Sequence, residues 1–264
     1  MSFTELVQEV CNICKDAADR IMEIYTTDFA VDNKQDSSPL TNADIASHKT
    51  ICAGLSGILP RFPVLSEESA DIPFSERKKW DRYWLIDPLD GTREFIKKNG
   101  EFTINVALIE HHQPVLGVVH VPVSGITYYA SMGQGAYKQS PDSDAIPIKV
   151  KSTRANEIII AGSRSHGNEK QQSFIDRLGN VEIHAIGSSL KFCLVAEGIV
   201  DIYPRFGPTS EWDTAAAQCI VEEAGGSVVD LGYKKLTYNS KSSLLNPEFL
   251  VIADKSFNWD SYIE

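Results

Sequence analysis

The stretch WLIDPLDGTREF, residues 84–95, is the feature that most constrains the fold of this chain. It directly follows Tyr83, and the apolar run through Ile86 predicts a buried strand because aromatic and branched residues continue without alternation. Asp87 and Asp90 come next, on either side of a proline whose ring fixes its own φ and biases the preceding residue toward an extended backbone. The sequence therefore predicts a strand that ends in two carboxylates at a defined turn.

A predicted helix opens on the far side of this turn. Gly91 permits close approach of the backbone, and Thr92 begins a short helix whose free N–H groups and positive dipole end suit a phosphate. The strand end, the carboxylates and the helix start together describe a seat for a metal ion and for the phosphate that it contacts. Two structural alternatives stay open on these residues alone, because Asp90 could cap the helix and Asp87 could stabilise the turn.

Composition excludes several classes of protein. With 264 residues, of which 42% are hydrophobic and 23% charged, the chain can bury a large core and is not expected to be disordered. Its formal net charge of −11 argues against a nucleic acid polymer as the main partner, although local basic groups and bound cations would still admit a small phosphorylated substrate. No apolar run approaches the length of a membrane span, and the first residues lack the features of a signal peptide. We therefore expect a cytoplasmic enzyme.

The cysteines agree with that location. Their number is odd and most fall within helical patterns, unlike a secreted disulfide framework: Cys11, Cys14, Cys52, Cys193 and Cys219. Cys11 and Cys14 could form half of a zinc site, but they follow an apolar helical stripe and no second Cys or His pair has matching spacing. We interpret both as core residues.

The first half of the chain combines helices with long strands. Apolar periodicity predicts an amphipathic helix over residues 3–25 and a second helix that starts near Thr41, which forms a capping-box pattern with Asp44. A short strand over 63–65 leads into Glu67. Antiparallel strands are then predicted over residues 102–109, 115–121 and 126–130.

The second half alternates strands with helices, which is typical of an α/β layer. The predicted strands cover residues 157–161, 181–185, 199–203, 227–230 and 249–253. The predicted helices cover residues 168–178, 188–197 and 211–224. A shift to Pro, Ser and Asp near 138–145 predicts the boundary between an N-terminal α+β lobe, residues 1–140, and a C-terminal α/β lobe, residues 141–264.

Acidic residues recur at the ends of predicted elements: Asp44, Glu67, Asp87, Asp90 and Asp213. Each alone has a structural explanation, such as helix capping or interaction with a helix dipole. Together they offer what hard divalent cations such as Mg²⁺ prefer, namely carboxylate, carbonyl and water oxygens completed by substrate phosphate. Two-metal sites hold their ions roughly 3.5–4 Å apart, but spacing along the chain does not show that these acids converge.

Similar motifs, in the same order, occur in the lithium-sensitive, Mg²⁺-dependent phosphatase superfamily that includes inositol monophosphatase. The segments that carry this resemblance are PLTNAD (39–44), LSEES (65–69), WLIDPLDGTREF (84–95) and EWDTAAA (211–217). The resemblance implies a sugar-phosphatase-type layered αβαβα sandwich, with an antiparallel sheet in the N-terminal lobe and an α/β C-terminal lobe.

The resemblance also implies two Mg²⁺ ions that share Asp87 as a bridging ligand. One ion would also bind Glu67 and the backbone carbonyl of Leu89, and the other would bind Asp90 and Asp213. Because Leu89 contributes only its backbone oxygen, its apolar side chain is no objection.

Catalytic roles follow from the same resemblance. The backbone N–H groups of Gly91 and Thr92 would hold the scissile phosphate, while the Thr92 hydroxyl, polarised by Asp44, would orient and deprotonate the attacking water. Attack would be in line on phosphorus, with a metal ion stabilising the departing sugar oxygen. Glu68 would support a third, weaker ion through water.

Further segments resemble the bacterial 3′(2′),5′-bisphosphate nucleotidases within that superfamily. They are EFIKKNGEFT (94–103), SRSH (163–166), IGSSLKFCLVAEG (186–198) and DIYPRFGPTSEWDTAA (201–216). A nucleotide with two phosphates needs positive charge that an inositol phosphate does not. The resemblance assigns the nucleotide and its second phosphate to Arg164, His166, Ser188, Lys191 and Arg205. It also counts as substrate contacts six residues of the metal and phosphate seat: Glu67, Leu89, Asp90, Gly91, Thr92 and Asp213.

The leading hypothesis is therefore hydrolysis of adenosine 3′,5′-bisphosphate to AMP and phosphate in sulfur assimilation, with the sulfated precursor PAPS as a second substrate. The alternatives are an inositol monophosphatase, a fructose 1,6-bisphosphatase, or a catalytically silent sensor of metal or nucleotide. Asp44 and Thr92 speak against the sensor, since activation of water needs them and binding does not. Oligomeric state stays open, a homodimer included, as does peripheral association with the inner membrane.

Overall fold

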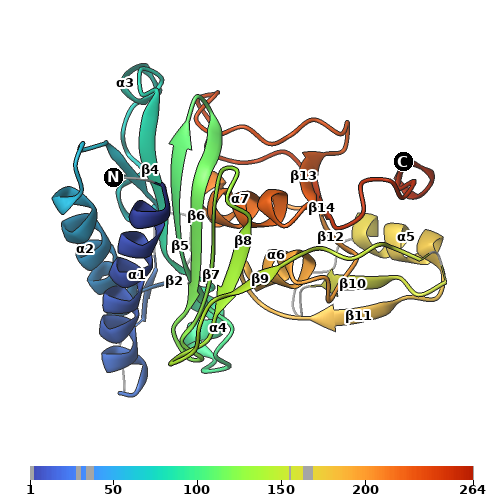
Figure 1. Cartoon of the computed structure of the whole chain (residues 1–264), viewed down its shortest axis with the longest axis horizontal. Coiled ribbons are helices and arrows are strands. Elements are labelled where there is room, and N and C mark those ends of the chain that lie inside the picture. The colour runs from blue at the N-terminus through green and yellow to red at the C-terminus, as the bar shows by residue number, and fades with distance from the viewer. Residues whose placement is uncertain (1–2, 28–30, 34–38, 155, 163–168, 264) are drawn as a thin grey trace.

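The computed structural model describes residues 3–27, 31–33, 39–154, 156–162 and 169–263. Two sheets dominate the molecule, and helices cover both outer faces and fill the space between the sheets (Figure 1). The predicted αβαβα sandwich is thereby confirmed.

The larger sheet belongs to the first part of the chain. Its seven strands are β3 (Val64–Ser66), β4 (Arg82–Asp90), β5 (Thr103–Glu110), β6 (Gln113–Val121), β7 (Ile126–Ser131), β8 (Ala136–Gln139) and β9 (Ile146–Ile148), in that spatial order. Only β3 and β4 pair in parallel, and the other neighbours are antiparallel. The remaining elements of this part are α1 (Phe3–Tyr25), the pair β1 (Val31–Asn33) and β2 (Pro39–Thr41), α2 (Asn42–Gly57), the 3₁₀ turn η1 (Glu67–Ser69), α3 (Phe74–Arg77) and α4 (Thr92–Ile96).

The smaller sheet has five strands in the order β11-β10-β12-β14-β13. They are β10 (Ile159–Gly162), β11 (Glu182–Ala185), β12 (Ile202–Arg205), β13 (Ser227–Asp230) and β14 (Phe249–Ile252). The first three run parallel, whereas β14 is antiparallel to both of its neighbours. The helices of this part are α5 (Glu169–Leu178), α6 (Leu190–Ala196), α7 (Ala215–Glu223) and the 3₁₀ turns η2 (Glu211–Asp213) and η3 (Asp260–Tyr262).

The layers arise because both sheets are apolar on both faces. Successive residues of a strand point to opposite faces, so Ile86 packs with α1 and α2 while Leu85 packs in the central layer with α6 and α7. The smaller sheet also buries both of its faces: Tyr203 packs in the central layer, and Ile202 packs against α5 on the outer face. The central helices are therefore buried between two sheets, and the site residues that they carry lie near the middle of the molecule.

Several predicted elements are confirmed. Helix α1 covers the predicted 3–25, and Cys11 and Cys14 are buried in its core-facing stripe. All five cysteines are free thiols. The predicted capping box at the start of α2 is present, with Thr41 as the N-cap residue and Asp44 as its partner.

Several predicted boundaries are wrong. The strands predicted over 157–161 and 199–203 are β10 (Ile159–Gly162) and β12 (Ile202–Arg205). Strand β4 does not end at Ile86 but continues through Asp90. The predicted helix 188–197 begins only at Leu190. The predicted helix 211–224 is split into η2 and α7, because Thr214 interrupts it with φ −117°.

The proposed division at residue 140 stays a prediction. That position falls between β8 and β9, which pair with each other in the larger sheet. Among the described helices, none combines the length and hydrophobicity that a membrane-spanning segment needs.

Candidate active site

A β-bulge in β4 brings Asp87 and Asp90 to the same place. In a regular strand, residues three apart point to opposite faces. Here Asp87 pairs with Asn105 and Asp90 pairs with Thr103, so β4 contains one residue more than its partner strand between these pairs. Such an extra residue reverses the alternation, and both carboxylates reach the same site.

Asp213 joins the pair from the other half of the chain. Carboxylate oxygens of Asp87, Asp90 and Asp213 all lie within 4.8 Å of one another, a separation that one cation could span. Asp213 ends the 3₁₀ turn η2, where its Oδ2 accepts a hydrogen bond from the Ser210 N–H at 2.9 Å. Glu67 lies near enough for a side-chain hydrogen bond to Asp87. The structure thus brings together all four carboxylates for which the sequence predicted metal binding.

The structural alternatives for the first two acids have different outcomes. Asp87 does stabilise its turn, because its Oδ1 accepts a hydrogen bond from the Leu89 N–H at 3.0 Å. Asp90 does not cap the following helix; its Oδ2 accepts from the Ser189 N–H at 2.6 Å, and Gly91 is the N-cap residue of α4.

Electrostatics favour a cation among these acids. Burial first, and then the charges of neighbouring acids led by Glu67, raise the pKa of the Asp87 carboxyl well above its usual range. The pKa of Asp213 is raised well above its usual range by burial and by the charge of Asp90. Burial raises the pKa of Asp90 to about 6, although the Lys191 ammonium opposes this effect. A divalent cation would offset both the desolvation and the repulsion, and the all-oxygen donor set suits a hard cation.

A second hydrogen-bonded pair lies beside the acid cluster. The Thr92 hydroxyl donates to Asp44 Oδ1 at 3.2 Å, and Thr41 donates to Asp44 Oδ2 through its N–H at 2.8 Å and its hydroxyl at 2.7 Å. The Asp44 side chain is buried, and these three hydrogen bonds hold its carboxylate in place. The Thr92 hydroxyl oxygen also lies 3.5 Å from the carbonyl oxygen of Leu89, which the sequence predicted as a metal ligand.

Gly91, where the sequence predicted a phosphate seat, joins β4 to α4. Gly91 has a φ of +92°, a left-handed conformation that glycine adopts easily, and it is the N-cap residue of α4. Three residues before it, the Pro88 carbonyl accepts a hydrogen bond from the Ser47 hydroxyl at 2.7 Å. The Leu89 side chain is buried in the outer core.

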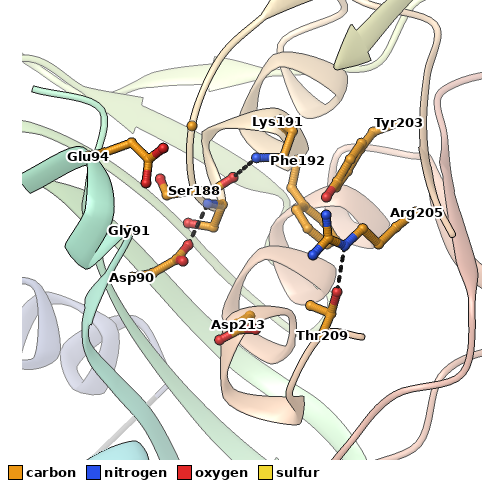
Figure 2. Close-up of a pocket in the computed structure, with 12 residues that line it drawn as sticks. Asp90, Gly91, Glu94, Ser188, Lys191, Phe192, Tyr203, Arg205, Thr209 and Asp213 are labelled. Atoms are coloured by element: carbon orange, nitrogen blue, oxygen red, sulfur yellow. Dashed lines mark hydrogen bonds between the residues drawn. The ribbon is translucent and has the colours of Figure 1, made fainter. Parts of the chain in front are cut away.

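A cavity of ≈ 140 Å³ opens next to the acid cluster. Its walls are formed by Asp90, Gly91, Glu94, Gly187, Ser188, Ser189, Lys191, Phe192, Tyr203, Arg205, Thr209 and Asp213. Figure 2 shows Asp90 and Glu94 on one wall, with Lys191, Tyr203 and Arg205 opposite them. The cavity therefore has an acidic side that continues into the proposed metal site and a basic side that faces it.

The two cations of the basic wall are held by hydrogen bonds. Lys191 is only 7% exposed, and its Nζ donates to the Ser188 carbonyl at 2.7 Å and to the Ile186 carbonyl at 3.3 Å. Burial lowers the pKa of Lys191 to about 8, against the attraction of Asp90. Arg205 is oriented by Thr209, whose hydroxyl accepts from its Nε at 2.7 Å.

Not every residue predicted to contact substrate is placed by the structure. Arg164 and His166 lie outside the described residues. Ser188 lines the cavity, but it precedes α6 and has a φ of +47°, so it is not part of that helix.

Sequence reasoning missed six other residues of the cavity: Glu94, Gly187, Ser189, Phe192, Tyr203 and Thr209. The available signal was their position inside the segments 94–103, 186–198 and 201–216, which the family resemblance covers. Within those segments, nothing in residue type distinguishes a cavity wall from core or loop.

Fold and site together define a class of protein. A five-layered sandwich with an all-oxygen acid cluster at the edge of a cavity is the arrangement expected of metal-dependent phosphatases in this superfamily. The model of the inositol monophosphatase family matches residues 3–256, and the chain belongs to that family.

Relatives with named activities are similar over nearly the whole chain. The 3′(2′),5′-bisphosphate nucleotidase CysQ of Salmonella typhimurium is 49% identical over 249 residues, which cover 93% of this chain and 99% of the relative. The CysQ of Escherichia coli strain K12 is 47% identical, with the same coverage. The crystal structure of CysQ from Bacteroides thetaiotaomicron has a TM-score of 0.84 and 41% identity, over 96% of this chain and 98% of that one.

Proposed function

We propose that this protein is a Mg²⁺-dependent nucleotidase that hydrolyses the 3′-phosphate of adenosine 3′,5′-bisphosphate to give AMP and phosphate. The observation that carries this proposal is the position of the acid cluster, Asp87, Asp90 and Asp213, at the edge of a cavity whose opposite wall presents Lys191 and Arg205. The identity to CysQ enzymes supports the same substrate class. PAPS, which carries the same 3′-phosphate, is the proposed second substrate, and sulfur assimilation is the proposed setting.

The acid cluster would hold two Mg²⁺ ions, with a third more weakly bound near Glu68. Asp87 would be the ligand that both ions share, because Glu67, Asp90 and Asp213 all lie close enough to it to raise the pKa of its carboxyl. The bound cations would supply charge neutralisation for the phosphoryl group and a lowered pKa for water. This donor set contains oxygen alone, which favours Mg²⁺ over softer metals.

The protein's own part in the chemistry is to position water and take up a proton. Since the Thr92 hydroxyl donates its hydrogen to Asp44 Oδ1, the lone pairs of Thr92 Oγ1 remain free to accept a hydrogen from the attacking water. As that water loses its proton to Thr92 Oγ1, the hydroxyl proton can pass on to Asp44 Oδ1. The hydrogen bonds from Thr41 fix the direction in which Asp44 presents that oxygen.

The basic wall favours a substrate with a second phosphate. Lys191 and Arg205 face the cavity from the side opposite the acid cluster, where the 5′-phosphate of the nucleotide would be bound. An inositol monophosphate has no group to pair with these charges. In a chain whose net charge is −11, two cations on one cavity wall provide the local positive charge that a dianionic group needs.

A substrate comparison tests this function. Purified protein with Mg²⁺ should hydrolyse adenosine 3′,5′-bisphosphate with kcat/KM at least about 100-fold above inositol 1-phosphate, because charge-assisted hydrogen bonds contribute about 1.5–3 kcal/mol each. Fructose 1,6-bisphosphate serves as a third substrate. Lithium should inhibit the reaction and excess Ca²⁺ should compete with Mg²⁺.

The contrary results are clear. Preference for the inositol ester would overturn the nucleotide assignment, and nucleotide binding without turnover would identify a sensor.

Lys191→Met should reduce the preference for the bisphosphate, whereas Glu9→Ala, an exposed change on α1, should not. The cytoplasmic location, the peripheral membrane association and the homodimer stay predictions from the sequence.

A further inference from the structure

A loop from the second half of the chain is clamped against the first half at the rim of the cavity. This loop, residues 186–189, connects β11 to α6 and is called here the 186–189 loop. A Cβ atom added to Gly187 would lie 2.8 Å from the Glu101 carbonyl oxygen and 2.8 Å from the Glu94 side chain. Only glycine permits this approach, so the two halves of the chain meet here backbone to backbone.

Side chains of the first half hold the loop by its N–H groups. The Glu101 Oε2 accepts a hydrogen bond from the Gly187 N–H at 2.9 Å, and Asp90 Oδ2 accepts from the Ser189 N–H. The Ser189 hydroxyl donates to Asn105 Oδ1 at 2.8 Å. Two N–H groups of the loop are therefore bound by acceptors on β4 and on the segment that precedes β5, and the Ser189 hydroxyl is bound by an acceptor on β5.

The clamped loop is in a conformation that needs support. Ser188 lies between the two clamped residues with a φ of +47°, in the left-handed region that disfavours any residue but glycine. From the opposite side, the Lys191 ammonium donates to the Ser188 and Ile186 carbonyls. Loss of the hydrogen bonds to the first half of the chain, or of those from Lys191, would let the Ser188 backbone leave the left-handed region. Ser188 and Lys191 would then both shift relative to the cavity.

We propose that Glu101 is a positioning residue for substrate selection: it holds the 186–189 loop so that Ser188 and Lys191 face the cavity. This inference rests on the proposed nucleotidase function. Glu101 is not among the clustered metal-binding acids, and it is not a wall of the cavity, so it acts through the loop. Its effect should therefore fall on binding of the nucleotide rather than on the chemical step.

The direction in which KM changes when the Glu101 carboxylate is removed distinguishes a positioning role from a purely electrostatic one. Glu101 places a negative charge near Lys191 and hence near the proposed site of an anionic substrate, which by itself disfavours binding. If charge were its only role, removal of the carboxylate would lower KM. If its hydrogen bond positions the loop, removal of the acceptor raises KM.

Two substitutions make the test. Glu101→Ala removes the acceptor, and we expect KM for adenosine 3′,5′-bisphosphate to rise about tenfold, as for one lost hydrogen bond to a charged group, with kcat changed much less. Glu101→Gln keeps an oxygen that can accept from the Gly187 N–H, so its KM should stay close to wild type. The exposed Glu9→Ala is the matched control for loss of a negative charge.

Hydrogen exchange supplies a readout that needs no activity. The Gly187 amide should exchange at least about tenfold faster in Glu101→Ala than in wild type, because its native hydrogen bond is lost, and thermal unfolding will show that the fold is intact. Unchanged KM and unchanged Gly187 exchange in Glu101→Ala would overturn the proposal, as would equal losses in the Ala and Gln variants. Failure of the wild type to hydrolyse the nucleotide would refute the proposed function instead, and exchange at Gly187 would still decide whether Glu101 holds the loop.

Discussion

Asp44 uses its two carboxylate oxygens for two different tasks. Oδ2 closes the capping box with Thr41 at the start of α2, while Oδ1 accepts the hydrogen bond from Thr92 beside the acid cluster. Asp213 divides its roles in the same way, since it caps η2 through Ser210 and also joins the acid cluster. At both positions the observed capping contact is compatible with the chemical role proposed for the residue, so neither interpretation excludes the other.

The double role of Asp44 predicts a double effect of Asp44→Asn. The amide is a poor proton acceptor, so we expect kcat to fall about 10²–10⁴-fold, the range typical of general acid–base catalysis. Weaker capping should lower the free energy of unfolding by about 1 kcal/mol. Steady-state kinetics and urea unfolding measure the two effects.

Thr41→Ala is the matched control. It removes a cap hydrogen bond from the same carboxylate but leaves the contact between Asp44 Oδ1 and Thr92. It should lose similar stability while it keeps most of kcat. Equal losses of kcat in both variants would mean that helix capping alone explains the effect.

At the scale of elements, the position of Asp213 depends on how closely α7 packs against the larger sheet. Gly117 on β6 touches α7 so closely that an added Cβ atom would lie 2.2 Å from the Ala216 carbonyl oxygen. Backbone atoms cannot move aside as a flexible side chain can. The residue type at Gly117 therefore controls the distance between β6 and the helix that follows Asp213.

Gly117→Ala should push α7 away from the sheet. We expect a loss of about 3 kcal/mol or more in the free energy of unfolding, because a methyl group would overlap the backbone of a packed helix. Asp213 would shift with the start of α7, so the affinity for Mg²⁺ should fall as well. Urea unfolding and Mg²⁺ titration measure these effects, and a stable variant with unaltered Mg²⁺ affinity would contradict this account of α7 packing.

At the scale of the whole molecule, the acid cluster brings together carboxylates from the two halves of the chain, and a cation would relieve the repulsion between them. Asp87 and Asp90 come from the larger sheet, and Asp213 comes from the turn before α7. Their pKa values are raised above the usual range for aspartate, that of Asp90 to about 6. A group with a raised carboxyl pKa in the folded state stabilises the fold while it is protonated, and that stabilisation is lost as pH rises through the folded pKa.

This sign gives a pH-dependent prediction. Metal-free protein should lose stability as pH rises from about 5 to 8, since Asp90 ionises near 6 among like charges. Mg²⁺ should restore that stability, so the increase in Tm on adding Mg²⁺ should be larger at pH 8 than at pH 5. Thermal unfolding with EDTA and with Mg²⁺ at both pH values measures it, and an increase in Tm that is the same at both would argue against a carboxylate cation site.

Local patterns were sufficient to predict much of this molecule. The periodicity of apolar residues predicted α1 at its observed bounds, and the capping pattern predicted the start of α2. The acids that cluster were predicted as a set only with the help of the family resemblance. The two helix features depend on hydrogen bonds and burial within a few residues of the chain. A short window of sequence therefore contains the information that they require.

Only the tertiary structure decided how those residues act together. The bulge that turns Asp87 and Asp90 toward one site depends on pairing with β5. The left-handed Ser188 stands next to Gly187, whose N–H is bound by Glu101 from the other half of the chain. Alternation along an isolated strand would have placed the two carboxylates on opposite faces. Register and long-range contacts are properties of two segments at once, and no single segment encodes them.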